Sequence, residues 1–254
     1  MFMEEKQPLS LEERHDIILD IMKDIDSFCR SHDIKYTISA GTMLGAVRHG
    51  GFIPWDDDAD LFMLREDFDR FAHIYKSDKY HLLYNTRKSD EFLATGFIKI
   101  SDPDTVVKNN STRTSYGVYV DIFPLDAVPA EPKSRHKYMH KLISLHNRLY
   151  HRQQKDIISY LKAYRHSLDW WWNKLDSEVH SGIYDDSGWV AQVIGTDNYR
   201  TVLKREVFDD LKDIEFESHK FLGFSDPHSY LSMLYGPDYM TPVKWAHNET
   251  IYRR

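Results

Sequence analysis

Four aspartates crowd one short segment of the chain: Asp56, Asp57, Asp58 and Asp60 fall within five consecutive positions. In an extended chain alternate side chains share a face, so Asp56, Asp58 and Asp60 should point one way and Asp57 the other. Carboxylates this close repel one another, and a hard divalent cation such as Mg²⁺ removes the conflict by binding their oxygens. An isolated acidic run is usually a solvated loop, but an apolar run at 61–64 follows this one. We therefore expect a metal site at the mouth of a buried strand.

Two further features extend the metal-site hypothesis. Asp121 is a lone acid between Val120 and Ile122, and a strand carboxylate with apolar neighbours usually has a partner. The alternative for Asp121 is an edge-strand side chain that faces water. Gly41 and Thr42 lie between a β-prone run and a helix start, where backbone N–H groups and the helix dipole favour phosphate. A phosphate site and a metal site would thus come from adjacent elements.

The elements that must position these residues alternate between helix and strand, which predicts an α/β (α+β) fold with a mixed sheet. Ser10 and Glu13 form a capping box before an apolar stripe of helical spacing, so we expect a helix over 11–32. Further helices are expected at 42–48, directly after Gly41, and at 66–75. Strands are expected at 36–39, 59–64, 97–100, 106–108 and 118–123. Asp126 follows Pro124 and is expected in a loop.

The chain changes character after Pro132: residues 133–174 hold ten basic side chains against two acidic ones. We predict a catalytic core over 1–130 and a mostly helical, partly basic segment over 131–254 that packs back on it. The basic stretch is open to three interpretations, namely a solvated helical face, contact with anionic lipid, or a groove for an anionic acceptor. The three tryptophans at 170–172 point in different directions on a helix, and two of them fall in a helical stripe made of Leu168, Trp171, Trp172, Leu175 and Val179. Core packing or contact with a partner is therefore favoured over an aromatic cage for a cation.

Overall composition narrows the class of protein. The 254 residues contain 33 Lys+Arg and 40 Asp+Glu, a formal charge of −7, which argues against a general nucleic-acid binder. A single cysteine, Cys29, excludes an internal disulfide and a multi-cysteine zinc site. No apolar run approaches the roughly 18 residues of a membrane span, and the N-terminus is too polar for a signal peptide. We expect a cytoplasmic protein that could act peripherally at the inner face of the membrane.

Three blocks resemble the LicD family of phosphotransferases within the wider nucleotidyltransferase-fold superfamily. They are "GTMLGAVRHGGFIPWDDDAD", "VYVDIFPLD" and "YLSMLYGPDYMTP". The similarity covers about residues 11–126 and 230–242. It implies a CDP-activated donor and transfer of phosphocholine from CDP-choline to the glycan of a teichoic acid or lipooligosaccharide, a glycan or glycolipid acceptor that is anionic. Fukutin-related members use CDP-ribitol, so ribitol or glycerol phosphate stays open as the cargo. The zinc site of some of those relatives is not expected here.

The resemblance also implies roles by position. Asp58 and Asp60 would be the metal-binding pair for Mg²⁺ (or Mn²⁺), and Asp121 the third carboxylate, either as a metal ligand or as the base. Gly41 and Thr42 would contact donor phosphate. Arg48 and Lys99 are candidates for steadying phosphate charge, although Lys99 could equally be a strand lysine that faces water. A nucleotidyltransferase would use the same three acids, and a non-catalytic binding module is the third hypothesis.

Overall fold

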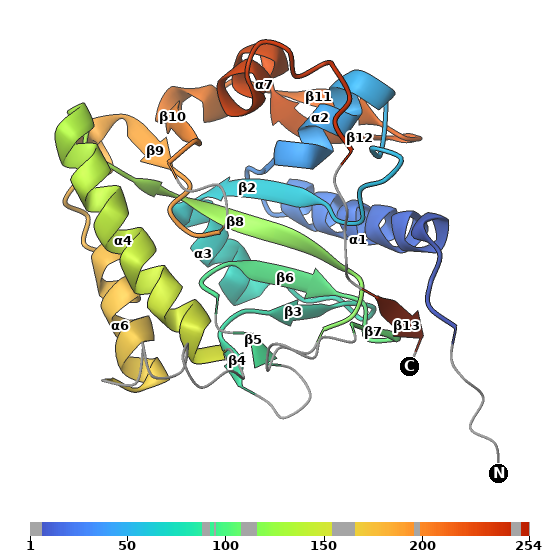
Figure 1. Ribbon diagram of the computed structural model, residues 1–254, viewed down its shortest axis with the longest axis horizontal. Helices are drawn as coiled ribbons and strands as arrows, with labels where there is room; N and C mark the ends of the chain where they lie inside the picture. The colour runs from blue at the N-terminus through green and yellow to red at the C-terminus, as the bar shows by residue number, and fades with distance from the viewer. Residues whose placement is uncertain are drawn as a thin grey trace.

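A mixed sheet at the centre of the molecule confirms the expected α/β fold (Figure 1). The computed structural model describes residues 7–87, 92–93, 95–107, 116–153, 166–195, 199–244 and 250–253. The sheet order is β1 (Thr37–Ile38), β2 (Asp60–Leu64), β8 (Tyr119–Ala127), β6 (Ile98–Ser101) and β3 (His81–Leu83). Strands β2 and β8 run parallel, and the other neighbours in this row are antiparallel. Strand β9 (Trp189–Ala191) pairs with the far end of β8, and β10 (Val202–Lys204) pairs with β9.

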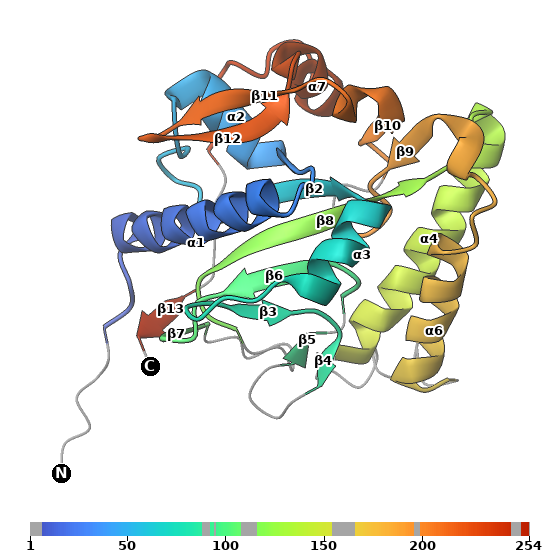
Figure 2. The ribbon, with the colours of Figure 1, turned by 180° about the vertical axis from the view of Figure 1, so that it is seen from behind.

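Shorter strand pairs and helices surround this sheet. The pairs are β4 (Thr86–Arg87) with β5 (Phe92–Leu93), β7 (Thr105–Val107) with β13 (Ile251–Arg253), and β11 (Leu211–Phe216) with β12 (His219–Phe224). The helices are α1 (Leu11–Ser31), α2 (Ala40–His49), α3 (Arg65–Ile74), α4 (Pro132–Gln153), α6 (Leu168–Val179) and α7 (Pro227–Tyr235), with short 3-10 turns at Asp185–Ser187 and Arg205–Phe208. Figure 2 shows α1 and α3 in front of β2 and β8, so these helices cover one face of the sheet. The predicted metal site would therefore lie on the opposite face of the sheet.

Helix α1 begins where its cap predicts. The Ser10 hydroxyl accepts a hydrogen bond from the Glu13 N–H at 3.1 Å, and the Glu13 carboxylate accepts one from the Ser10 N–H at 2.9 Å. This reciprocal pair confirms the expected capping box. Ile18, Ile21 and Ile25 follow at helical spacing and are fully buried. Burial of this stripe fixes α1 across the sheet.

Strand β8 is longer than the sequence suggests. It continues through Pro124 to Ala127, so the expectation that Asp126 lies in a loop is wrong. Asp126 is buried, and its carboxylate accepts a hydrogen bond from the Arg65 guanidinium at 2.7 Å. This ion pair joins β8 to the first turn of α3. Asp126 is therefore part of the packing between helix and sheet.

The stretch 131–254 contains α4, α6 and α7 together with strands β9–β13, and the proposed division at residue 130 stays a prediction. Within α6, Trp171 and Leu175 are buried in an apolar cluster with α4 residues such as Leu142. Core packing is thus confirmed for the tryptophan stripe. Among the described helices, none combines the length and apolar character needed to span a membrane.

The Arg65–Asp126 pair should matter for stability because removing one partner leaves the other charge buried without compensation. We expect Asp126→Ala to lower the free energy of unfolding by about 3–5 kcal/mol, measured by urea denaturation. Asp69→Ala is the matched control, since Asp69 also pairs with Arg65 at 3.4 Å but is 37% exposed. That control should cost about 0–1 kcal/mol. Equal losses for the two variants would contradict this account.

Candidate active site

A row of charged side chains crosses three adjacent strands of the sheet. Asp60 on β2 is in register with Asp121 on β8, and Asp121 is in register with Lys99 on β6. Residues opposite one another on adjacent strands project from the same face. The register therefore brings together two of the predicted carboxylates and the predicted lysine, although they are separated by tens of positions in the sequence.

Lys99 is the counter-ion of Asp121. Its ammonium donates to both carboxylate oxygens, at 2.7 and 2.9 Å. The same ammonium lies 3.3 Å from the ring centroid of Tyr119, and Lys99 is only 5% exposed. The interpretation of Lys99 as a lysine that faces water is therefore wrong. Its predicted contact with phosphate stays a prediction, and the observed contact is an ion pair with a buried carboxylate.

Asp60 lies at the most crowded point of the row. Burial, and then the neighbouring charges of Asp58 and Asp121, raise the pKa of Asp60 well above its usual value, while Lys99 acts in the opposite direction. The backbone N–H of Asp60 donates to the Thr42 hydroxyl at 2.8 Å. Thr42 therefore positions the residue that carries this carboxylate, and its predicted contact with phosphate remains a prediction.

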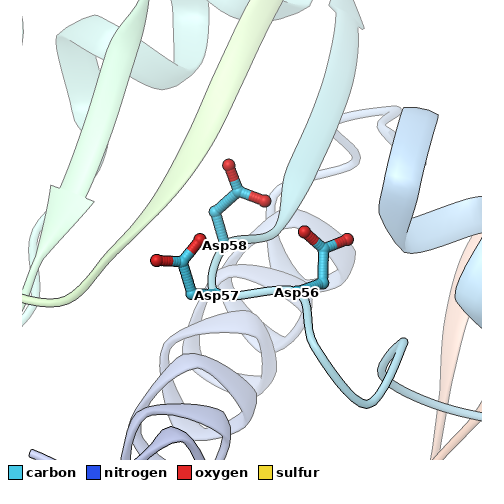
Figure 3. Close-up of side chains that lie close together, drawn as sticks. All are labelled: Asp56, Asp57 and Asp58. Carbon is cyan, nitrogen blue, oxygen red and sulfur yellow. The ribbon is translucent and has the colours of Figure 1, made fainter. Parts of the chain in front are cut away.

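The acidic segment before β2 is attached to helix α1. The Arg14 guanidinium donates to the Asp57 carboxylate at 3.1 Å, and the His15 ring nitrogen lies 2.7 Å from the Asp56 carbonyl oxygen. Figure 3 shows the three consecutive carboxylates of Asp56, Asp57 and Asp58 spreading from this segment in different directions. Their nearest oxygens lie within 4.8 Å of one another.

The start of helix α2 is strained and lies against these acids. The helix begins at Ala40, two residues before the expected start, so Gly41 lies inside its first turn. Ala40 has φ +43°, a left-handed conformation that is costly for a residue with a side chain. Its N–H donates to the Tyr230 hydroxyl at 3.0 Å, which holds the turn in place. A Cβ atom at Gly41 would lie 2.7 Å from an Asp56 carboxylate oxygen, so a side chain at this position would displace that carboxylate.

Two pockets meet at the carboxylates. The larger, of about 780 Å³, is bounded by the first turn of α2, Arg48, Trp55 and the acids Asp56, Asp58 and Asp60. The smaller, of about 200 Å³, shares Ala40, Asp58 and Asp60 with it and adds Asp121, Gln192 and three phenylalanines. Asp56, Asp58 and Asp60 share the large pocket, as the expected alternation predicts. Asp57 pairs with Arg14, although one of its carboxylate oxygens stays within 4.8 Å of those of Asp56 and Asp58. Asp121 lines the small pocket with Asp58 and Asp60.

Sequence reasoning assigned no role to several residues of these walls. Four residues of the block "YLSMLYGPDYMTP" line the large pocket, namely Tyr235, Asp238, Tyr239 and Thr241. The resemblance of this block to the LicD family could have identified them as residues of the site. Arg48 donates to the Tyr239 carbonyl at 3.1 Å, and partial burial lowers the pKa of Arg48 from its usual value. This contact ties α2 to the loop after α7. Gln192 of the small pocket had no signal of its own.

The geometry agrees with comparisons to known proteins. Residues 33–166 match the family described as LicD/FKTN/FKRP, nucleotidyltransferase domain. The chain belongs to this LicD family. It is 31% identical to the lipopolysaccharide cholinephosphotransferase LicD of Haemophilus influenzae, over 91% of this chain and 92% of that protein. The chain is accordingly a LicD-type transferase.

Shorter stretches of the chain match other proteins. The chain is 50% identical to the mouse ribitol 5-phosphate transferase FKRP, but over only 34 residues, 13% of this chain and 7% of that protein. It is 40% identical to the uncharacterized protein RT0683 of Rickettsia typhi over 84 residues, 32% of this chain and 25% of that protein. The long match to the bacterial LicD protein is therefore the informative one.

The Lys99–Asp121 pair makes a testable prediction about buried charge. Lys99→Met leaves the Asp121 carboxylate buried beside Asp60 without its counter-ion, so we expect a loss of about 3–5 kcal/mol in unfolding free energy. Adding Asp121→Asn removes the stranded charge and should restore most of that loss, as measured by denaturant unfolding of both variants. Lys212→Met, in the exposed 3.7 Å pair with Asp210, is the control and should cost about 0–1 kcal/mol. A double variant as unstable as Lys99→Met would show that packing on Tyr119 matters and charge does not.

The raised pKa of Asp60 predicts how stability depends on pH. Above that pKa the ionised carboxylate opposes folding, because the folded state binds its proton more tightly than the unfolded state does. Asp60→Asn should therefore stabilise the protein in EDTA at pH 7 by about 0.5–2 kcal/mol. The gain should shrink as the pH falls through the folded-state pKa and vanish below about 3.9. Asp78→Asn, at an exposed site, is the control, and a gain that does not change with pH would refute the explanation.

Proposed function

We propose that this LicD-family protein transfers phosphocholine from CDP-choline to a hydroxyl group of a cell-surface glycan and releases CMP. The observation that carries the proposal is the row of carboxylates where the two pockets meet, since Asp58 and Asp60 line both. A donor on one side and a hydroxyl on the other would meet at this row. The similarity to a lipopolysaccharide cholinephosphotransferase along nearly the whole chain supports phosphocholine as the cargo and a glycan as the acceptor.

The large pocket supports binding of the nucleotide donor. Gly41 lies in the first turn of α2, where N–H groups lack intrahelical partners and the helix dipole favours anions. Arg48 adds a positive charge to the same wall, and Trp55, Tyr235 and Tyr239 offer aromatic faces. A volume of about 780 Å³ is within the range of small-molecule sites. The diphosphate would bind near Gly41 and Arg48, with the cytosine ring on the aromatic side chains.

The carboxylates fit a divalent cation. Asp58, Asp60 and Asp121 offer carboxylate oxygens, and their mutual repulsion, expressed in the raised pKa of Asp60, is what a bound cation would relieve. Asp58, Asp60 and Asp121 would hold Mg²⁺ or Mn²⁺. When bound, the ion would neutralise charge on the donor phosphates. Lys99 occupies one lone pair on each Asp121 oxygen, and a carboxylate oxygen has a second one to offer.

The residues themselves would orient the reacting groups and handle the proton. Thr42 holds the backbone of Asp60, and Arg14 turns Asp57 away from the donor. Asp121 would receive the proton of the attacking hydroxyl or orient that hydroxyl. Phosphoryl-type transfer depends on positioning and charge neutralisation, which such a fixed frame supplies.

The basic helix α4 supports an anionic glycan or glycolipid as the acceptor. Lys133 and Lys137 are exposed on it, whereas Lys141 is paired with Glu178 at 2.5 Å. Exposed cations of this kind would attract a negatively charged glycan or lipid surface. We therefore include peripheral contact with the inner membrane face, in a cytoplasmic protein, in the proposal.

The decisive experiment supplies CDP-choline, CDP-ribitol and CDP-glycerol separately with Mg²⁺ and a glycan acceptor, and measures CMP. We expect CMP from CDP-choline, and a fall in kcat of about 10²–10³-fold for Asp58→Asn or Asp60→Asn because charge neutralisation is lost. Asp57→Asn is the matched control and should change kcat less than 10-fold, since that carboxylate is held by Arg14. Mg²⁺ should also raise the Tm of the wild-type protein and not that of Asp60→Asn.

A donor labelled in either its choline part or its cytidine part distinguishes the proposed transfer from a nucleotidyltransferase reaction. Transfer of label from the choline part supports the proposed reaction, whereas transfer from the cytidine part would identify a nucleotidyltransferase. If the protein prefers CDP-ribitol or CDP-glycerol, the transferred group is ribitol phosphate or glycerol phosphate in place of phosphocholine, and the proposed mechanism is unchanged. Unchanged CMP release in Asp58→Asn and Asp60→Asn would remove the carboxylate row from catalysis.

A further inference from the structure

The proposed donor site in the large pocket does not account for several residues that line the small pocket. It holds about 200 Å³, below the size of a typical nucleotide or drug site, so it suits a group of few atoms. Its floor is a row of three aromatic rings, Phe62 on β2, Phe123 on β8 and Phe97 just before β6. Phe123 lies 4.7 Å from Phe97 and 6.5 Å from Phe62, measured between ring centroids.

Two oxygens in this wall are buried without a partner. Among the residues that the structure describes, neither Gln192 Oε1 nor Ser39 Oγ has a hydrogen-bond partner. Gln192 is 5% exposed and Ser39 is fully buried, and both line the small pocket. An unpaired buried oxygen opposes folding, so such atoms are usually found where a ligand or water supplies the missing donor. A ligand in the pocket with hydroxyl or N–H groups would supply the missing donors if these two side chains turned toward it.

The backbone around Gln192 fixes its position in the wall of the small pocket. Gln192 follows strand β9, and its N–H donates to the Thr201 carbonyl at 3.1 Å. Gly195 has φ +115°, and a Cβ atom on it would lie 2.7 Å from the Gln192 side-chain amide nitrogen and 2.9 Å from the Phe123 ring. A residue with a side chain at 195 would therefore displace the glutamine. The glycine keeps the Gln192 side chain against the aromatic floor.

The charge of the small pocket rejects an anion. Asp58, Asp60 and Asp121 line it, and no lysine or arginine belongs to the described part of its wall. The nearby ammonium of Lys99 is bound by Asp121. The cation of the described walls, Arg48, lies in the large pocket, so the donor phosphates would be drawn to that side. A neutral molecule with hydroxyl groups and an apolar face fits what remains.

We propose that the small pocket is the subsite for a sugar ring of the glycan that receives phosphocholine. Gln192 Oε1 and Ser39 Oγ accept hydrogen bonds from the sugar hydroxyls, and the ring lies on Phe97 and Phe123. The inference deepens the proposed function and rests on it for the identity of the reaction. It adds a location and two recognition residues for the second substrate.

The arrangement is consistent with the chemistry of the transfer. The sugar hydroxyl oxygen forms a bond to the β-phosphorus of CDP-choline, the bond from that phosphorus to the oxygen bridging the two phosphates breaks, and CMP leaves with the electron pair. The hydroxyl proton passes to the Asp121 carboxylate and then to water. Attacking and leaving oxygens must lie in line on opposite sides of the phosphorus. The large and small pockets share Asp58 and Asp60, so the leaving oxygen would lie on the side of the large pocket and the attacking hydroxyl on the side of the small one.

Ligand-observed NMR tests the subsite directly. Methyl glycosides of glucose, galactose and N-acetylgalactosamine are added to the protein in the presence of saturating CDP-choline. We expect saturation transfer to at least one glycoside, and a loss of at least 10-fold in its affinity for Gln192→Met and for Ser39→Ala. CDP-choline affinity should change less than 2-fold. The Tm of both variants should equal or exceed that of the wild type, because the oxygens removed have no partner in the described structure; a lower Tm would identify a purely structural role.

Each contrary result assigns the pocket differently. Competition between CDP-choline and the glycoside would place the sugar in the large pocket. Displacement of the glycoside by choline chloride would assign the small pocket to the donor headgroup. No binding by any glycoside would also overturn the proposal. If glycoside binding depends on Gln192 but no CDP-alcohol releases CMP, the subsite stands and the proposed reaction fails.

Discussion

Repulsion among carboxylates at the start of β2 is the constraint on which the rest of this structure depends. Asp58 and Asp60 share one face of the chain, Asp121 joins them from β8, and the raised pKa of Asp60 records the cost. The fold opposes this cost with fixed backbone. The parallel register of β2 and β8 includes a hydrogen bond from the Asp121 N–H to the Ala59 carbonyl at 2.9 Å. Backbone held in this way keeps the carboxylates close together, as the proposed cation site requires.

The same row of acids divides the site into two chemically different halves. On one side, the first turn of α2 and Arg48 offer positive potential to an anion. On the other lie phenylalanine rings and the oxygens of Gln192 and Ser39, which have no hydrogen-bond partner among the described residues. Under the proposed function, an anionic donor and a hydroxyl-bearing substrate would be directed to different halves. Orientation of the two substrates would follow from electrostatics as much as from shape.

Local patterns in the sequence predicted those features that depend on neighbouring residues. The α1 capping box, the strand at 59–64 and the shared pocket of Asp56, Asp58 and Asp60 all follow from spacing. Features that depend on register between distant strands were not predictable. Lys99 meets Asp121 only because β6 pairs with β8 in one register. Gln192 reaches the site only because β9 pairs with the end of β8, and no local pattern records either pairing.

Pro124 shows how one residue links this topology to the site. The Asp121 N–H points toward β2, and N–H directions alternate along a strand, so the N–H that proline lacks would point to the opposite edge of β8. On that edge β6 pairs with residues 119–122 and β9 with residues 126–127, and Pro124 lies between them. The small pocket opens at this interruption, between Phe97 before β6 and Gln192 after β9. A proline that would break an ordinary central strand here separates two partner strands and leaves room for a ligand beside the carboxylates.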